Sequence, residues 1–181
     1  MNVFVLSVFI ATVLSQALDF NKFRQYDYQL IIERASIPHY DKRYMNYAKL
    51  TPFKCNRTNV ALNRMASFKV NVGIDLVIMV QAYRFASNEY RSFPLRFQDK
   101  MCNLLKENIG GMQKLLNCGS FSGCPVVSNT NITVCNFIPD ASMLPPFIPS
   151  GNYRLNLQAL FSNNELFLTE VYGKVTRPEV K

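Results

Sequence analysis

The chain contains no tryptophan and a single histidine, His39, among its 181 residues. Nucleophilic catalysis by a Ser–His–Asp or Cys–His arrangement needs a histidine beside the nucleophile, and His39 follows Pro38 in a stretch expected to be a loop. The sequence also lacks a nucleophile-elbow motif and a glycine-rich phosphate loop. Its acidic residues are too scattered to indicate a catalytic pair; they include Asp75, Asp99, Asp140, Glu165 and Glu170. These absences predict a protein that is not an enzyme and that holds no cofactor.

Long apolar runs are also missing, apart from Val3 to Leu14 at the N-terminus. That run has about a dozen residues, whereas a membrane-spanning helix needs about 20. It lacks a positively charged segment before it, but Ser15-Gln16-Ala17 supplies small residues at the positions that a signal peptidase reads. We therefore expect residues 1–17 to be a signal peptide and residues 18–181 to be a single secreted, extracellular domain with no stable membrane insertion.

Acidic residues are scarce, with 12 Asp and Glu against 20 Lys and Arg and a net charge of +8. The basic residues are scattered, and no run is longer than Lys42-Arg43. Nucleic-acid binding is not predicted, because it needs a basic stripe or patch. The charge favours solubility with some attraction to acidic surfaces. Since 49% of the residues are hydrophobic and 18% are charged, the chain can bury a core.

Five cysteines are present, and in an exported chain disulfides are the default. Five thiols form at most two bridges, and spacing alone does not choose the pairs. A zinc site is not expected, because Cys118 and Cys124 are separated by five residues and the single histidine is distant. Two sequons, Asn56-Arg57-Thr58 and Asn131-Ile132-Thr133, predict N-glycosylation of Asn56 and Asn131.

A period of two dominates the middle of the chain, which is typical of a strand with one buried face. The apolar positions are Phe68, Val70, Val72, Ile74, Leu76, Ile78, Val80 and Ala82. The run exceeds an ordinary strand of about 5–6 residues. It predicts either one long bent strand or two strands, with the bulge or bend at Gly73.

Other segments complete an all-β pattern with a helical insert. Asp99 is expected to cap a short helix, and a second helical turn is expected after Gly110-Gly111. Pro38 is expected to end the first strand, Asn63-Arg64 to break the second, and Asn163-Asn164 to form a hairpin turn. The expected strands cover residues 26–32, 53–62, 132–137, 153–160 and 166–175. This order predicts a β-sandwich.

Three motifs occur in a recognisable order. Asp99-Lys100-Met101-Cys102-Asn103-Leu104-Leu105 is followed by Cys124-Pro125, and then by Leu144-Pro145-Pro146-Phe147-Ile148-Pro149-Ser150-Gly151-Asn152-Tyr153-Arg154. The order resembles the ML lipid-recognition superfamily, most closely the ganglioside activator proteins and the related insect chemosensory A/B-type proteins. The resemblance covers roughly residues 26–175. The chain departs from the ganglioside activators in having fewer cysteines and no terminal bridge, which leaves Cys55 without an assigned role.

The resemblance implies an immunoglobulin-like sandwich whose sheets splay apart around an apolar cavity. It also implies a disulfide between Cys102 and Cys124, and a further pairing of Cys118 with Cys135 is our second expectation. An alternating apolar face more often forms closed core than a ligand wall, so only the resemblance assigns these residues to a pocket. The pocket candidates are Phe68, Val70, Val72, Leu76, Ile78, Val80, Phe137, Leu144, Phe147, Ile148, Leu157 and Phe161.

Two functional hypotheses follow. In the first, the protein carries or presents a lipid or other hydrophobic molecule, such as a pheromone delivered to a receptor. In the second, it is an interaction module with a filled core that acts on a cell-surface receptor or assists a lipid hydrolase. Uptake of an apolar molecule separates the two.

Overall fold

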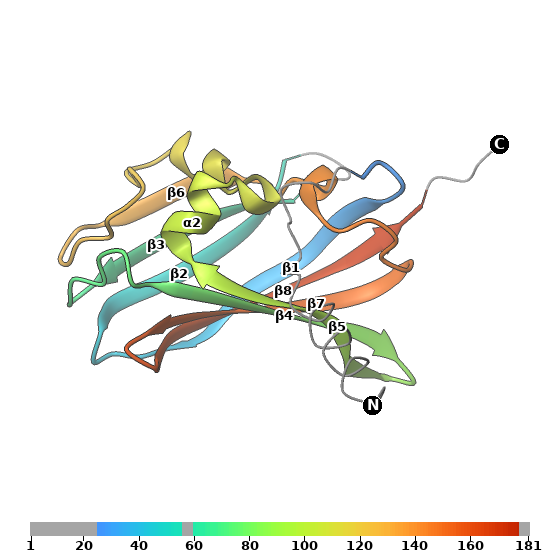
Figure 1. The fold of residues 1–181 in the computed structure, drawn as a ribbon, viewed down its shortest axis with the longest axis horizontal. Helices are drawn as coiled ribbons and strands as arrows, with labels where there is room; N and C mark the ends of the chain where they lie inside the picture. The colour runs from blue at the N-terminus through green and yellow to red at the C-terminus, as the bar shows by residue number, and fades with distance from the viewer. Residues whose placement is uncertain (1–24, 56–59, 178–181) are drawn as a thin grey trace, which may run out of the picture.

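The computed structural model describes residues 25–55 and 60–177, and the expected signal peptide therefore lies outside the described residues. Two antiparallel sheets face each other (Figure 1). The large sheet has five strands in the order β1-β8-β7-β4-β5, and the small sheet has three in the order β2-β3-β6. The strands are β1 (Gln29–Tyr40), β2 (Met45–Lys54), β3 (Val60–Phe68), β4 (Val77–Ala86), β5 (Glu89–Lys100), β6 (Ile132–Phe137), β7 (Gly151–Phe161) and β8 (Asn164–Thr176). The expected all-β sandwich is confirmed.

The alternating segment forms two strands in different sheets. β3 ends at Phe68 in the small sheet, and β4 begins at Val77 in the large sheet. Gly73 lies in the connection with a φ of 52°, a left-handed conformation that favours glycine, and its N–H donates to the Val126 carbonyl at 2.9 Å. Within β4 the expected alternation holds, since Ile78 and Val80 are buried while their neighbours are partly exposed.

The first strand continues past Pro38, so the prediction that proline ends it is wrong. β1 is an edge strand of the large sheet, and its pairing with β8 shifts register between Ser36 and His39. A proline has no N–H to donate, but an edge or a bulge tolerates that loss. His39 consequently lies in a strand and not in a loop, and its imidazole contacts the Glu165 carboxylate.

Two further predictions of strands need correction. The strand expected over residues 53–62 covers the end of β2 and the start of β3, with residues 56–59 outside the described residues. Asn63-Arg64 does not break this region, because both residues lie inside β3. β5 was not predicted, although Phe93, Leu95 and Phe97 alternate along it; Pro94 is tolerated there because β5 is also an edge strand.

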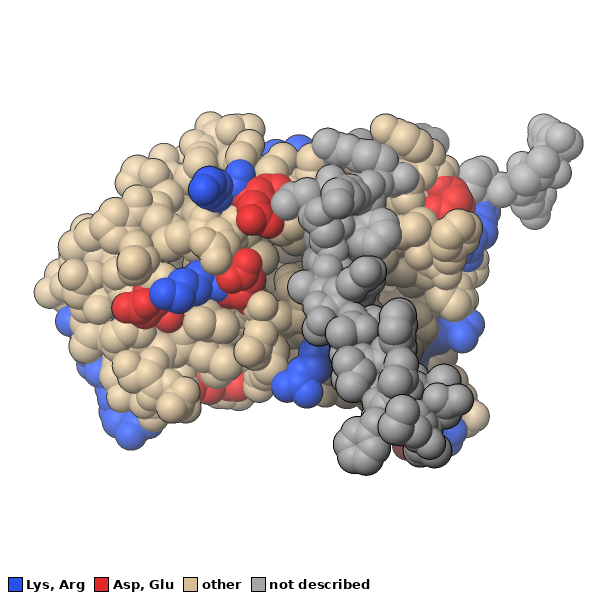
Figure 2. Space-filling view, in the orientation of Figure 1, with Lys and Arg blue, Asp and Glu red and all other residues tan. Residues whose placement is uncertain are grey.

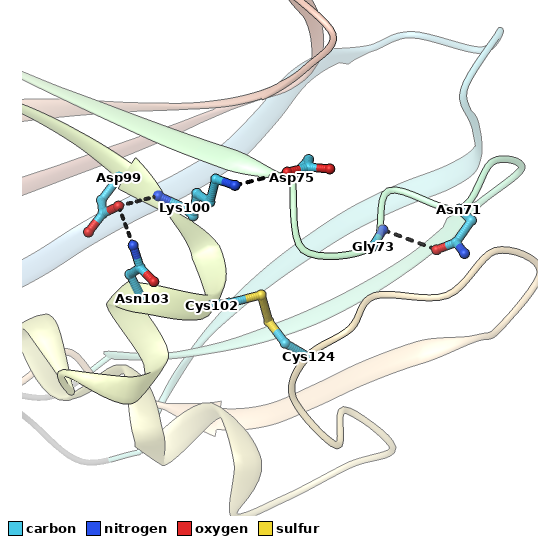
Figure 3. Close-up of a disulfide and its surroundings, with 8 residues drawn as sticks. All are labelled: Asn71, Gly73, Asp75, Asp99, Lys100, Cys102, Asn103 and Cys124. Carbon is cyan, nitrogen blue, oxygen red and sulfur yellow. Dashed lines mark hydrogen bonds and ion pairs between the residues drawn. A yellow bond between two sulfur atoms is a disulfide. The ribbon is translucent and has the colours of Figure 1, made fainter.

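The helical insert connects β5 to β6, the edge strands of the two sheets (Figure 1). It consists of α2 (Met101–Lys106) and the 3-10 helix η2 (Ile109–Leu116). The helix begins one residue later than expected: Lys100 occupies the N-cap position, so the prediction that Asp99 caps the helix is wrong, and no side chain among the described residues caps it. Asp99 instead accepts hydrogen bonds from the Lys100 N–H at 2.6 Å and from Asn103 Nδ2 at 2.9 Å (Figure 3).

Both expected cysteine pairs occur in the structure and fix this insert. Cys102 on α2 is bonded to Cys124, with the Cα atoms 5.8 Å apart (Figure 3). Cys118, just after η2, is bonded to Cys135 on β6, with the Cα atoms 5.3 Å apart. Cys55 is exposed and has no disulfide partner.

The two long edges of the sandwich are closed in different ways. On one side β1 and β2 contact each other directly, and on the other side the insert spans from β5 to β6. The short helix η3 (Ala141–Met143) lies between β6 and β7 and is linked to η2, because the Asp140 N–H donates to the Gly110 carbonyl at 2.9 Å. No helix in the described residues is long and apolar enough to cross a membrane.

Charged side chains of both signs are mixed over the face seen in Figure 2. Several are paired across loops, such as Lys100 with Asp75 at 2.9 Å and Lys114 with Asp140 at 3.1 Å. On this face the excess of basic residues does not gather into a single patch.

An apolar cavity between the two sheets

A cavity of about 260 Å³ lies between the large sheet, the small sheet and the insert. It exists because the two layers differ in width. With strands about 4.8 Å apart, five strands span about 24 Å and three span about 14 Å, so the small sheet covers only part of the face opposite it. The insert covers the remainder on the β5 side.

All five strands of the large sheet present one face to this cavity. The side chains alternate, so every second residue of a strand points inward. The inward residues are Leu30 and Ile32 on β1, Ile78, Val80 and Ala82 on β4, Phe93, Leu95 and Phe97 on β5, Tyr153, Leu155 and Leu157 on β7, and Phe167, Thr169, Val171, Gly173 and Val175 on β8.

The opposite wall is thinner and more adaptable. The small sheet supplies Leu50, Leu62, Arg64, Val134 and Phe137. The insert supplies Met101, Leu104, Ile109, Gly110, Met112 and Leu115. The thioether side chains of the two methionines are unbranched and can adopt several shapes, so this side of the cavity can adjust to an occupant.

Half of the pocket candidates line the cavity. They are Ile78, Val80, Phe137, Leu144, Ile148 and Leu157. The other half lie elsewhere: Phe68, Val72 and Leu76 are buried in the closed core, Val70 and Phe161 pack against that core, and Phe147 is 81% exposed. For Val70, Val72 and Leu76 the reason is the break after Phe68, which places them in the connection between β3 and β4 rather than on a strand of the wall.

The sequence reasoning missed much of the wall, including β1, β5, the inward face of β8, Arg64 and the helical insert. β5 was absent from the expected strands, although its alternating Phe93, Leu95 and Phe97 carry the necessary signal. The inward face of β8 was expected as a strand but not as a wall. Arg64 was interpreted as a strand breaker, and nothing in the local sequence shows that its side chain points inward.

The segment that carries the Pro-Ser-Gly-Asn-Tyr-Arg motif closes one part of the cavity through Leu144, Ile148 and Tyr153. The Tyr153 hydroxyl donates to the Pro149 carbonyl at 2.8 Å, and the Tyr28 hydroxyl donates to the Pro145 carbonyl at 2.8 Å. Burial raises the pKa of both phenols above its usual value, so they stay neutral. These tyrosines are therefore satisfied hydrogen-bonding groups that hold the segment in place.

Two other polar side chains on the wall lack such partners. The guanidinium of Arg64 lies over the ring of Phe167, with its Cζ 4.1 Å from the ring centroid. Burial lowers the pKa of Arg64 to about 10, which still leaves it positively charged at neutral pH. The hydroxyl of Thr169 is buried and makes no hydrogen bond with any residue that the structure describes. Both residues line the cavity.

Fold and site together define a two-sheet β-sandwich with an internal apolar cavity. Within the described residues, no three side chains of His, Cys, Asp or Glu come together as a metal site requires.

A family model described as "Protein of unknown function (DUF1091)" matches residues 76–155, which run from just before β4 into β7. No curated protein matches the chain. Among solved structures, the chain is similar to a Niemann-Pick type C2 protein from Japanese carpenter ant, with 8% sequence identity and a TM-score of 0.39. That similarity covers 78% of this chain and 98% of the ant protein.

Proposed function

We propose that this protein is a secreted binding protein for a lipid or other hydrophobic small molecule. The observation that carries the proposal is the cavity of about 260 Å³ with an almost wholly apolar wall. A closed core leaves few voids larger than a water molecule, whereas a cavity of about 150 Å³ already accepts benzene. Pockets for drug-sized ligands begin near about 300 Å³. The size fits one slender chain or a compact apolar molecule.

Burial supplies the driving force for such a ligand. Each CH₂ group transferred from water into an apolar wall contributes about 0.8 kcal/mol, reduced by the cost of immobilising the ligand. Met101 and Met112 on the insert can adapt to the shape of the occupant. Nothing in this role requires catalysis or a cofactor.

Export from the cell is part of the proposal. The two disulfides support this, because disulfides form and persist in an oxidising compartment such as the secretory pathway. Asn131 is exposed directly before β6 and can accept a glycan there, while Asn56 lies outside the described residues. The expected cleavage after Ala17 would release the domain beginning at residue 18.

The biological setting that we propose follows the sequence resemblance. In it the protein presents a hydrophobic signal, such as a pheromone, to a cell-surface receptor, as an insect chemosensory protein does. The alternative, an accessory module with a filled core, gains no support from the open cavity between the sheets.

Displacement of a fluorescent apolar probe tests the proposal. The secreted, oxidised protein is titrated with the probe and then with long-chain acids, alcohols and hydrocarbons. Val171→Phe adds bulk to the cavity wall, and Val127→Phe makes the same change at a surface position that is 46% exposed. We expect saturable uptake by the native protein and the Val127 variant and weaker uptake by the Val171 variant. No uptake by folded native protein would contradict carriage and favour the accessory module.

A further inference from the structure

Arg64 occupies a position where the strand pattern calls for an apolar residue. Leu62, Ala66 and Phe68 share one face of β3 with Arg64 and are buried, and Arg64 itself lines the cavity, so its side chain lies on the inward face. Leu62 and Arg64 both line the cavity, two residues apart on the same face. The chain therefore places a cation on an otherwise apolar wall.

This cation has no counter-ion among the described residues. Arg64 is partly buried, forms no ion pair and no side-chain hydrogen bond with those residues, and its guanidinium contacts the face of Phe167. Other half-buried arginines differ: Arg154 lies 3.9 Å from the Glu170 carboxylate, and Arg84 donates to the Ser150 carbonyl at 3.1 Å. Even partial removal of a charge from water without a partner costs free energy, and an anionic ligand in the cavity would offset that cost by pairing with the guanidinium.

Thr169 lines the opposite wall of the cavity, two residues from the Phe167 ring that the guanidinium contacts. Phe167 and Thr169 are two residues apart on the inward face of β8, which places their Cα atoms about 7 Å apart. The guanidinium over Phe167 and the unpartnered hydroxyl of Thr169 therefore face the same part of the cavity. A charged donor and a hydroxyl donor are then available to a single acceptor group.

We infer that the occupant of the cavity is a hydrophobic monocarboxylic acid whose carboxylate binds Arg64 and accepts a hydrogen bond from the Thr169 hydroxyl. The inference rests on the proposed carrier function and specifies its ligand class. A guanidinium can hold a carboxylate by two parallel N–H···O bonds, and an apolar surrounding strengthens the pair. The hydrocarbon chain would lie along the aliphatic wall made by β4 and β7.

A matched set of ligands tests this inference. A neutral fluorescent probe is displaced by dodecanoic acid, dodecanol and methyl dodecanoate, which share one chain and differ in the head group. We expect the native protein to bind the acid roughly ten- to a hundredfold more tightly than the alcohol, because only the acid forms a hydrogen-bonded charge pair with Arg64. Arg64→Met should abolish that preference while still taking up the probe and dodecanol. The control is Arg96→Met, at an exposed position outside the cavity wall, which should keep the preference.

The outcomes separate the inference from the function beneath it. If native protein binds the acid and the alcohol equally, or if Arg64→Met keeps the preference for the acid, the inference is overturned and the carrier function stands. If none of the three ligands displaces the probe, or no probe binds, the carrier function itself fails. Thr169→Val should reduce the acid preference by a smaller factor than Arg64→Met.

Discussion

At the scale of single residues, Asp140 joins three parts of the structure. Its carboxylate accepts hydrogen bonds from the Ser142 hydroxyl at 2.7 Å and the Ser142 N–H at 3.1 Å, and it pairs with Lys114 of η2. The Ser142 hydroxyl is the main cause of a lowered pKa of Asp140, and Lys114 adds to it. A carboxyl with a lowered folded-state pKa stabilises the fold above its unfolded pKa, and this stability is lost as the pH falls through the folded value.

We expect Asp140→Ala to lower the free energy of unfolding by about 1 kcal/mol at pH 7, as the loss of a helix cap does. The difference from the native protein should shrink as the pH is lowered below about 4, where the native carboxyl becomes protonated. Urea denaturation at a series of pH values measures this. Asp75→Ala is the control, because the exposed pair of Asp75 with Lys100 should contribute little. An unchanged difference at acid pH would contradict the assignment.

A second prediction at this scale concerns Arg64 and the stability of the ligand-free protein. A methionine at this position fills similar space without a charge to desolvate. Arg64→Met should therefore raise the free energy of unfolding by about 1 kcal/mol, after the loss of the contact with Phe167 is allowed for. Urea denaturation of delipidated protein tests it. If Arg64 served stability alone, Arg64→Met would instead lower the free energy of unfolding.

Arg64 also shows where sequence reasoning ends. An Asn-Arg pair after an apolar run is a reasonable strand end, and the direction of a side chain depends on register, which the pairing of β3 with β2 and β6 decides. Periodicity alone cannot reveal an inward charge that has no ion-pair partner among the described residues.

At the scale of elements, two adjacent glycines shape the insert. Gly110 and Gly111 have φ values of 60° and 78°. A Cβ on Gly110 would meet nothing within 4 Å, whereas one on Gly111 would lie 2.8 Å from the Cβ of Asp140. Gly110 is needed only for its left-handed backbone conformation. Gly111 is needed both for that conformation and for the close approach of η2 to the segment before η3.

The pair offers a matched comparison. Gly110→Ala should cost about 1 kcal/mol, from the left-handed backbone alone. Gly111→Ala should cost more, because the clash with Asp140 must also be relieved by moving one segment. Thermal denaturation ranks the two variants. Equal losses would show that the approach to Asp140 imposes no constraint.

The elements that sequence predicted well are those whose signal is local. β6 was predicted with its observed bounds, and β7 and β8 to within two residues, since alternation and flanking turn residues mark them. β1 was predicted too short because Pro38 indicates a strand end, and β5 was missed altogether although Phe93, Leu95 and Phe97 alternate along it. Both are edge strands, where a proline is acceptable. The order of strands in a sheet decides which strands lie at its edges. That order is set by pairing between segments far apart in the sequence, which local patterns do not reveal.

At the scale of the whole molecule, the division into two sheets explains which pocket candidates were misplaced. An uninterrupted alternation from Phe68 to Ala82 looks like one surface, but the chain crosses from the small sheet to the large sheet within it. The two-sheet sandwich could be predicted from strand number and resemblance. The cavity wall could be predicted only in part, because it depends on how the five-stranded sheet faces the three-stranded sheet.

Occupancy should stabilise the whole fold. A ligand present at about a hundred times its dissociation constant adds about 2.7 kcal/mol to the free energy of unfolding. For a domain of this size that corresponds to a rise in Tm of about 5–10 °C. Differential scanning calorimetry with and without a bound long-chain acid measures the shift. Val171→Phe should show a smaller rise, and equal rises in both proteins would place the ligand outside the cavity.

The placement of the two disulfides has a consequence for the timing of ligand exchange. Cys118–Cys135 makes the insert move with the small sheet, while among the described residues only the main chain at Lys100 joins the insert covalently to the large sheet. With β1 and β2 in contact on the other side, we expect the sandwich to open between β5 and the insert. The residence time of an occupant is then governed by the contacts along that seam. Reducing the disulfides should speed release more than it weakens binding.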